Sequence, residues 1–178
     1  MDLVGQVAEG HKGGQAYTLD IIHLISQHFD YSKRFPQSQA KFSVDGYADR
    51  AISDEAKRVV MHYDNATRYD DMVLDSLLSL HGQDEAVVVF LADHGEEVYD
   101  DLPVHGRLFS ELTAAMATQE YEVPIWIWCS ESYQMRHREV VSAIKAAQDK
   151  PFVTARLPHL LLALAGIACQ WSADYQTF

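Results

Sequence analysis

The chain has 178 residues and a formal net charge of -12 at pH 7, with a pI near 5.0. A hydrophobic content of 48% and three tryptophans are typical of a globular protein with a proper core and not of a disordered chain. The acidic balance argues against nucleic acid as the main partner, because phosphate binding needs a basic face. It also argues against simple adsorption to an anionic membrane surface.

The sequence contains no segment that is expected to cross a bilayer. The longest apolar run, Leu160–Cys169, has about half of the ~20 residues that a spanning helix needs. The N-terminus, Met1–Gln6, lacks a basic region followed by an apolar one, so no signal peptide is expected. Cys129 and Cys169 could form one disulfide or remain two buried thiols, and their spacing decides neither.

The first half of the chain predicts a strand, an irregular segment and a long helix. The β-branched and apolar stretch Tyr17–Ile25 predicts a buried strand that ends near His23. Asp30–Asp49 contains a proline, a glycine and several polar residues, and it predicts an irregular excursion. Asp54–Leu80 has one apolar face at helical spacing, with Ser53 as a suitable N-cap.

The second half predicts two further strands and two further helices. These elements are the strands Ala86–Ala92 and Glu122–Ser130 and the helices Glu131–Gln148 and Arg156–Ile167. His159 lies among leucines of the last helix, where a core histidine with a satisfied hydrogen bond is expected. The order of the elements indicates an α/β layered fold.

The most informative stretch joins the second expected strand to Asp93 and His94. Buried parallel strands read as continuous apolar runs, and their ligands lie at the carboxyl ends. A carboxylate beside an imidazole, with His105 eleven residues after His94, provides the oxygen and nitrogen ligands that zinc binds. Gly95 and Gly106 follow the two histidines and would let the backbone turn tightly. The alternative is an ordinary turn, since Asp and Gly are favoured in turns for backbone reasons.

Two further histidines follow the first expected strand, as Asp93 and His94 follow the second. These are His23 and His28. If both strand ends open onto one edge of a sheet, these four residues and His105 would lie together there. The alternative for His23, which is closest to the strand, is burial with an internal hydrogen bond.

Six short motifs extend this pattern along the chain. In order they are His23-x-x-x-x-His28, Tyr31–Pro36, Tyr63–Ala66, Leu91–Glu96, His105-Gly106 and Val123–Trp126. In this order they resemble the lipid A phosphoethanolamine transferases of the sulfatase and alkaline phosphatase superfamily. The likeness runs from about Tyr17 to Ile167. It implies a partial alkaline-phosphatase-like layered sheet flanked by helices.

The resemblance implies roles for the candidate residues. Asp93 and His94 match two zinc ligands of the family, which implies one or two zinc ions. His28 and His105 match histidines that face the phosphoryl group or a second metal, so they would be catalytic and would bind the substrate. His23 matches the first histidine of the same motif and would contribute to substrate binding.

The resemblance also implies a reaction and a location for the parent enzyme. A zinc-activated threonine would attack phosphatidylethanolamine, and phosphoethanolamine would pass to lipid A or to a core sugar of lipopolysaccharide. The parent enzyme would be anchored in the bacterial inner membrane, with its catalytic domain in the periplasm.

The family's threonine nucleophile and an acidic metal ligand lie far upstream of the histidine motif, but only 22 residues precede His23 here, with Thr18 as the lone threonine. Residues 1–178 are therefore expected to form one soluble domain, the C-terminal portion of such a catalytic domain. It would lack the nucleophile region and the membrane helices, and it would be inactive by itself. An incomplete sheet would leave an open strand edge, so homo-oligomers are expected.

Some features depart from the family. Ile25-Ser26-Gln27 replaces the usual Met-Gly-Ser or Met-Gly-Asn, and Phe29-Asp30 replaces Gly-Pro. The loop between Asp93 and His105 is unusually acidic, and it either tunes donor recognition or is simply solvated. A sulfatase or phosphodiesterase of the same superfamily, or a non-catalytic binding module, are the alternative functions.

Overall fold

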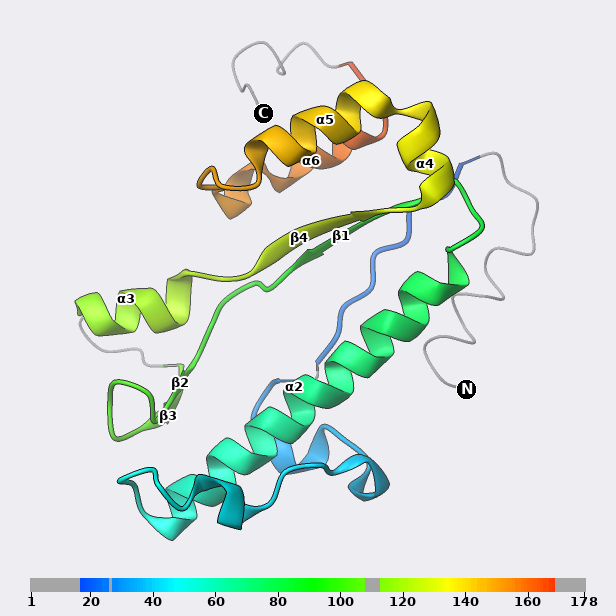
Figure 1. Ribbon diagram of the computed structural model, residues 1–178. Coiled ribbons are helices and arrows are strands. Elements are labelled where there is room, and N and C mark those ends of the chain that lie inside the picture. Colours follow the sequence, from blue (N-terminus) through cyan, green and yellow to red (C-terminus); the bar gives the residue numbers. More distant parts are fainter. Residues whose placement is uncertain (1–16, 26, 108–112, 169–178) are drawn as a thin grey trace. The chain divides into compact units, whose positions relative to one another are not determined.

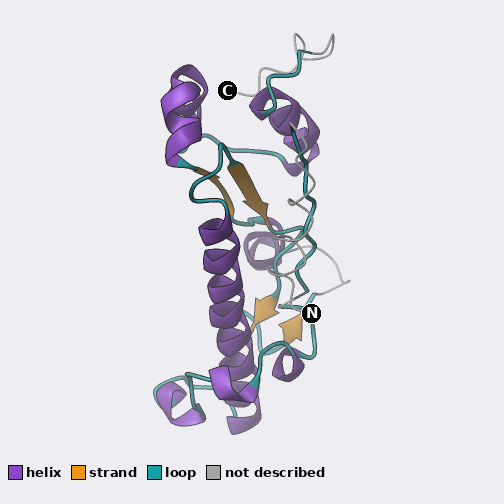
Figure 2. Cartoon of the chain, turned by 90° about the vertical axis from the view of Figure 1, so that its right-hand side faces the viewer, coloured by secondary structure: helices purple, strands orange, loops and turns teal. Residues whose placement is uncertain are grey.

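The computed structural model describes residues 17–25, 27–107 and 113–168 (Figure 1). They form a mixed α/β structure that is mostly helical, with small sheets (Figure 2). The chain divides into two compact units. Unit 1 comprises the chain up to Leu80 together with His94–Val123, and unit 2 comprises His81–Asp93 and the chain from Pro124 onward.

Unit 1 is organised around the long helix α2 (Asp54–Leu80), as the apolar periodicity predicts. Ser53 Oγ accepts a hydrogen bond from the Ala56 N–H at 3.1 Å, which confirms the expected N-cap. The side chains that α2 buries are Ala56, Val60, Asn65, Ala66, Asp70 and Leu77.

The segment before α2 forms short 3-10 helices, η2 (Tyr31–Lys33), η3 (Gln37–Gln39) and η4 (Val44–Tyr47), which agrees with the irregular excursion expected there. The fully buried side chain of Asn65 ties this segment to α2. Its Oδ1 accepts from the N–H groups of Lys41 and Phe42 at 2.6 and 3.0 Å. Its Nδ2 donates to the carbonyls of Phe42 and Met61 at 3.1 and 2.9 Å.

A small antiparallel hairpin completes unit 1. The strand β2 (Glu97–Val98) pairs with β3 (His105–Gly106), and Val98 lies opposite His105. The helix α3 (Ala114–Tyr121) follows, and Thr113 Oγ1 accepts from the Met116 N–H at 3.3 Å as its N-cap.

Unit 2 contains the two-stranded sheet of β1 (Val87–Leu91) and β4 (Ile125–Cys129). Both strands agree with the sequence prediction. Ser130 Oγ accepts from the N–H groups of Ala86 and Tyr133 at 3.0 and 3.2 Å, so one hydroxyl secures the end of the sheet and caps the next helix.

The remaining helices of unit 2 are α4 (Glu131–Arg136), α5 (Arg138–Ala147), the 3-10 helix η5 (Thr154–Arg156) and α6 (Leu157–Leu164). The single helix expected over 131–148 is interrupted at His137, whose ψ of 46° is not helical. The Tyr133 hydroxyl donates to the Leu164 carbonyl at 3.0 Å and thereby joins α4 to the end of α6. His159 of α6 is half-buried.

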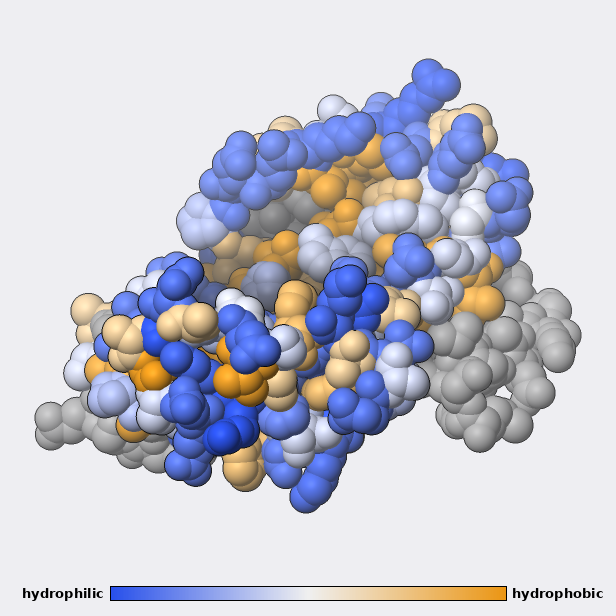
Figure 3. All heavy atoms as spheres, turned by 60° about the horizontal axis from the view of Figure 1, so that its bottom comes forward, coloured by the Kyte–Doolittle hydropathy of each residue, from blue (hydrophilic) through white to orange (hydrophobic). Residues whose placement is uncertain are grey.

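The buried strand expected at Tyr17–Ile25 is wrong. These residues have no regular secondary structure, and Tyr17 and Ile21 are 93% and 85% exposed. His23 is also exposed, so the alternative of a buried, internally hydrogen-bonded histidine is wrong for this residue. A strand needs a partner for its backbone groups, and the sheets of the described residues pair only β1 with β4 and β2 with β3. Figure 3 shows hydrophobic side chains lying among hydrophilic ones at the surface.

The expectation of buried parallel strands is also wrong for the sheet that precedes Asp93. The strands β1 and β4 run antiparallel, with Leu91 opposite Ile125, and every residue of both strands is half-buried. An apolar run does not encode the direction of its partner, because neighbouring strands of either direction bury the same side chains.

Within the ranges that the structure describes, no helix combines the length and apolar character that a membrane span requires.

The buried side chain of Asn65 generates a stability prediction. Replacing it with alanine (Asn65→Ala) removes the partner of four backbone groups at a fully buried position, and an unsatisfied buried group costs roughly 1–3 kcal/mol. We expect the free energy of unfolding, measured by urea denaturation, to fall by about 3 kcal/mol after partial relaxation.

Ser76→Ala is the matched control on the same helix. Its hydroxyl donates to the Met72 carbonyl at 2.8 Å on an exposed face, so the change should stay within about 0.5 kcal/mol. Equal effects of the two substitutions would contradict the anchoring role of Asn65.

Candidate functional site

Aromatic contacts in unit 1 bring two of the predicted histidines to one region. Phe29, directly after His28, has its ring centroid 5.7 Å from that of His105. The Phe29 ring also meets the edge of Tyr31 at 5.9 Å, and Tyr31 meets Tyr63 of α2 at 5.2 Å. The turn after His28 therefore lies against both β3 and α2, and the convergence of the His28 and His105 imidazoles stays a prediction.

The backbone around His28 is held by one arginine. Arg34 Nε donates to the His28 carbonyl at 2.6 Å, and its Nη2 donates to the Phe29 carbonyl at 3.0 Å. The two carbonyls face the same guanidinium, so the turn that carries His28 is fixed while its imidazole stays exposed.

Hydrogen bonds define where the neutral imidazoles of His28 and His94 carry their protons. The Nδ1 of His28 lies 2.8 Å from the Phe29 carbonyl oxygen, and the Nδ1 of His94 lies 2.9 Å from the Gly95 carbonyl oxygen. A carbonyl oxygen can only accept, so Nδ1 carries the proton and the lone pair is on Nε2. This is the tautomer with which histidine binds a metal through Nε2.

His105 has a different partner. Its Nδ1 lies 3.0 Å from the Tyr99 hydroxyl, and the two ring centroids are 5.4 Å apart. Since Phe29 lies within contact of the same imidazole, His105 is positioned by aromatic rings from two segments.

The turn that carries His94 depends on Gly95. Its N–H donates to the Glu120 carbonyl at 2.9 Å, and a Cβ built on it would lie 2.1 Å from the Gln119 carbonyl oxygen. Gly106, after His105, has a φ of 92°, a conformation that side chains disfavour. Both glycines that follow the candidate histidines are thus required by the backbone, as the sequence predicts.

Asp93 and His94 are consecutive, and the boundary between the units falls between them. Asp93 is exposed and ends one segment of unit 2, whereas His94 is half-buried and begins a segment of unit 1. His23 is exposed and lies in the segment without secondary structure.

The acidic loop after His94 is only partly solvated. Glu97 is fully buried, and its Oε1 accepts from the N–H groups of Asp100 and Asp101 at 2.5 and 3.0 Å. Glu96 accepts a hydrogen bond from the Tyr31 hydroxyl. Burial, followed by this bond to Glu96, raises the pKa of Tyr31, so the phenol stays protonated.

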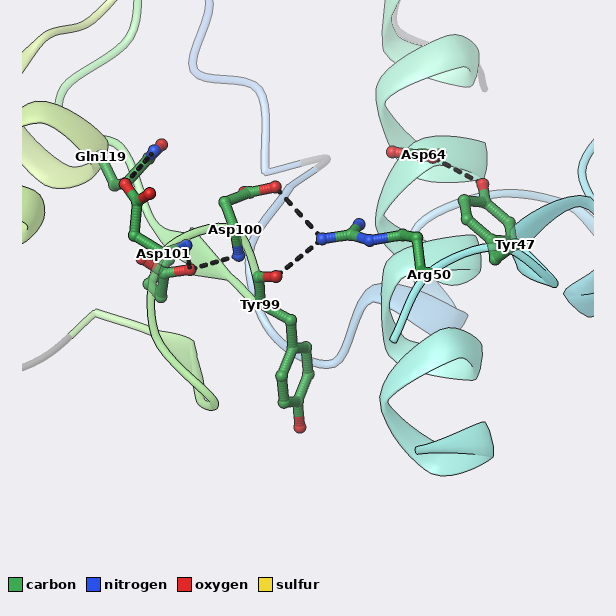
Figure 4. A network of polar contacts seen from close by, with 8 residues as sticks. Tyr47, Arg50, Asp64, Tyr99, Asp100, Asp101 and Gln119 are labelled. Carbon is green, nitrogen blue, oxygen red and sulfur yellow. Dashed lines mark hydrogen bonds and ion pairs between the residues drawn. The ribbon is translucent and has the colours of Figure 1, made fainter. Parts of the chain in front are cut away.

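Figure 4 shows the polar network that holds this loop. Arg50 Nη2 donates to the Tyr99 carbonyl at 2.7 Å and lies 3.4 Å from Asp100 Oδ1. Gln119 Nε2 donates to Asp101 Oδ2 at 2.9 Å. Burial raises the pKa of Asp100, although the adjacent guanidinium opposes this effect. The loop is therefore built into unit 1 by contacts that its acidic composition does not reveal.

Asp93 and His94 have the ligand types that zinc binds. Across residues 17–25, 27–107 and 113–168, no three His, Cys, Asp or Glu side chains come together to hold a metal ion. Asp93 and His94 nevertheless supply carboxylate and imidazole ligands of the types that zinc prefers, and His94 has the suitable tautomer. Zinc needs about four ligands, so these two residues alone would not complete a zinc site.

The sulfatase family profile matches residues 18–167 of this chain. The phosphoethanolamine transferase EptC of Escherichia coli strain K12 is 34% identical over 157 residues, which cover 84% of this chain and 26% of that protein. The Kdo(2)-lipid A phosphoethanolamine 7''-transferase of the same strain is 29% identical over 115 residues, or 65% of this chain and 20% of that protein. The chain thus spans about a quarter or less of the length of these relatives.

A solved structure gives the same indication. The crystal structure of the C-terminal periplasmic domain of EptC from Escherichia coli, in complex with zinc, is similar with a TM-score of 0.66 and 31% sequence identity. The similarity covers 80% of this chain and 40% of that one.

The close approach at Gly95 generates a second prediction. Gly95→Ala places a methyl group against the Gln119 carbonyl, so the His94 turn and α3 must move apart. We expect the free energy of unfolding, measured by urea denaturation, to fall by roughly 2 kcal/mol, as overpacking usually costs.

Gly46→Ala is the matched control, because a Cβ there meets no atom within 4 Å and the φ of Gly46 is not positive. This control should leave the stability unchanged or slightly higher. If Gly95→Ala behaves in the same way, the turn is not held as described.

Proposed function

Because the chain belongs to the sulfatase family, we propose that it is part of the catalytic domain of a phosphoethanolamine transferase. The enzyme would move phosphoethanolamine from phosphatidylethanolamine to lipid A or a core sugar of lipopolysaccharide. The names of the relatives support the transferred group, and the Kdo(2)-lipid A enzyme supports this class of acceptor. Similarity to a periplasmic domain supports a location on the periplasmic side of the inner membrane.

The observation that carries the proposal is the contact between the His28 turn and His105. The ring contact of Phe29 with His105 at 5.7 Å joins segments that are far apart in the sequence. We assign His28 and His105 to the phosphoryl group of the substrate. His23, five residues before His28, is assigned to substrate binding on the sequence pattern alone.

Asp93 and His94 are assigned to zinc. A bound zinc ion would polarise the phosphoryl oxygens and lower the pKa of the attacking hydroxyl. The backbone carbonyl of Gly95 holds the His94 proton on Nδ1, so that Nε2 carries the lone pair for the metal.

The exposed His28 has its Nε2 lone pair available for proton transfer in the neutral ring. A neutral His28 accepts a proton from a hydroxyl group, and a protonated His28 donates to a phosphoryl oxygen. The bond from Nδ1 to the Phe29 carbonyl suits both states, because Nδ1 donates in each.

The partners of the proposed enzyme are a phospholipid donor and a lipopolysaccharide acceptor. A net charge of -12 disfavours nucleic acid as a partner. Among the described strands, β1 pairs with β4 alone, so the homo-oligomer expected through an open sheet edge stays a prediction.

Zinc titration by isothermal calorimetry tests the metal assignment. The chain should bind zinc, and the Asp93→Ala, His94→Ala double variant should bind more than about tenfold more weakly, because both metal bonds are removed.

A matched control removes another His–Asp pair, His81 and Asp84, whose Nδ1 and Oδ2 lie 3.1 Å apart. The His81→Ala, Asp84→Ala variant should bind zinc as the unchanged chain does. Loss of binding in the control, with retention in the Asp93/His94 variant, would move the metal away from the proposed site.

A further inference from the structure

Tyr99 has a backbone conformation that non-glycine residues rarely adopt. Its φ is 59°, and it is the one non-glycine residue with a positive φ among those the structure describes. Such conformations persist where the surrounding structure determines them by several contacts, and they concentrate at functional sites. Tyr99 lies in the loop between β2 and β3, six residues before His105.

Three anchors hold the backbone of Tyr99 in this conformation. Its N–H donates to the Val104 carbonyl at 3.0 Å, and its carbonyl accepts from Arg50 Nη2 at 2.7 Å. The next two N–H groups, of Asp100 and Asp101, donate to the buried carboxylate of Glu97. Figure 4 shows Arg50 reaching from the segment before α2 to this loop. The direction of the Tyr99 side chain is therefore set by its backbone.

The side chain so directed contacts His105. The Tyr99 hydroxyl lies 3.0 Å from His105 Nδ1. A phenol has one proton to donate, and an unprotonated imidazole nitrogen is a good acceptor for it. The contact allows either direction, but a phenol is a stronger donor than acceptor, so the favoured arrangement has Tyr99 donating to Nδ1 and the proton of neutral His105 on Nε2.

We propose that Tyr99 is a positioning residue that holds neutral His105 with its proton on Nε2. On the proposed function, His105 then donates a hydrogen bond from Nε2 to a phosphoryl oxygen of the substrate and is not a zinc ligand through that atom. His28 and His94 have the opposite tautomer, set by backbone carbonyls. In the neutral rings, Nε2 is thus a hydrogen-bond donor in His105 and carries a lone pair in His28 and His94.

The test is ¹⁵N NMR of the histidine side chains in the metal-free chain, at a pH where the imidazoles are neutral. His105 should show a protonated Nε2 and an unprotonated, hydrogen-bonded Nδ1, whereas His28 and His94 should show protonated Nδ1. In Tyr99→Phe, the His105 Nδ1 signal should shift toward that of a nitrogen without a donor, and a second tautomer should appear.

Tyr47→Phe is the matched control. Its hydroxyl donates to Asp64 Oδ2 at 2.5 Å in the same unit, so it should leave the His105 signals unchanged. The His28 and His94 signals should be the same in all three proteins, which shows that Tyr99→Phe has not unfolded the site.

A protonated Nδ1 on His105 in the unchanged chain would overturn the proposal, as would a His105 spectrum that Tyr99→Phe does not alter. The spectra require neither zinc nor substrate, so this result is independent of the proposed function. Adding O-phosphoethanolamine to the zinc-loaded chain then tests the function, since the His105 Nε2 signal should shift. With the tautomer as expected, an unmoved signal would count against the function and not against the role of Tyr99.

Discussion

The candidate site of unit 1 depends on Tyr31, which joins the three segments that carry it. Its side chain is 1% exposed, and its ring meets the rings of Phe29 and of Tyr63 on α2. Its hydroxyl donates to Glu96, two residues after His94. Because burial and this carboxylate raise the pKa of Tyr31, the phenol keeps its proton and the bond persists at neutral pH. One buried residue thus connects the turn after His28, the long helix and the loop after His94.

With the proposed tautomers, this arrangement gives the three histidines two chemical states. The Nδ1–H groups of His28 and His94 donate to backbone carbonyls, and a tyrosine hydroxyl faces the Nδ1 of His105. Phosphoryl transfer requires groups that bind a metal, groups that donate to oxygens and groups that accept a proton. Three residues of one type can divide these tasks when their hydrogen-bond partners differ, and here the partners are supplied by the local backbone and by one loop.

Much of the fold follows from local signals in the sequence. The helix α2 was predictable because its N-cap and its apolar face are encoded within the segment, and the apolar runs of β1 and β4 are equally local. The pairing of strands is not local. The segment 17–25 has the composition of a strand but lacks a partner strand in the described structure. The apolar sequences of β1 and β4 do not encode whether the two strands run parallel or antiparallel.

In the candidate site, too, some features follow from local sequence and others depend on how the chain folds. The glycines after His94 and His105 were predictable, because a close approach and a positive φ both demand glycine. The role of Arg50 was not, since it depends on contacts with Tyr99 and Asp100, which lie 49 and 50 residues away. The roles of Tyr99 and Glu97 were not either, since they depend on the conformation of the loop that joins them to His105 and to Asp100. Glu97 in particular belongs to a run of acidic residues that is typical of a solvated loop, yet its side chain is fully buried.

The most direct test of the account is a crystal structure of the zinc-loaded chain with anomalous data collected at the zinc edge. The account predicts an anomalous peak about 2.0–2.2 Å from an Asp93 carboxylate oxygen and from His94 Nε2, which are the usual zinc distances. Zinc bound at other residues, such as the His81–Asp84 pair, with Asp93 and His94 outside its coordination sphere, would contradict the assignment on which the proposed function rests.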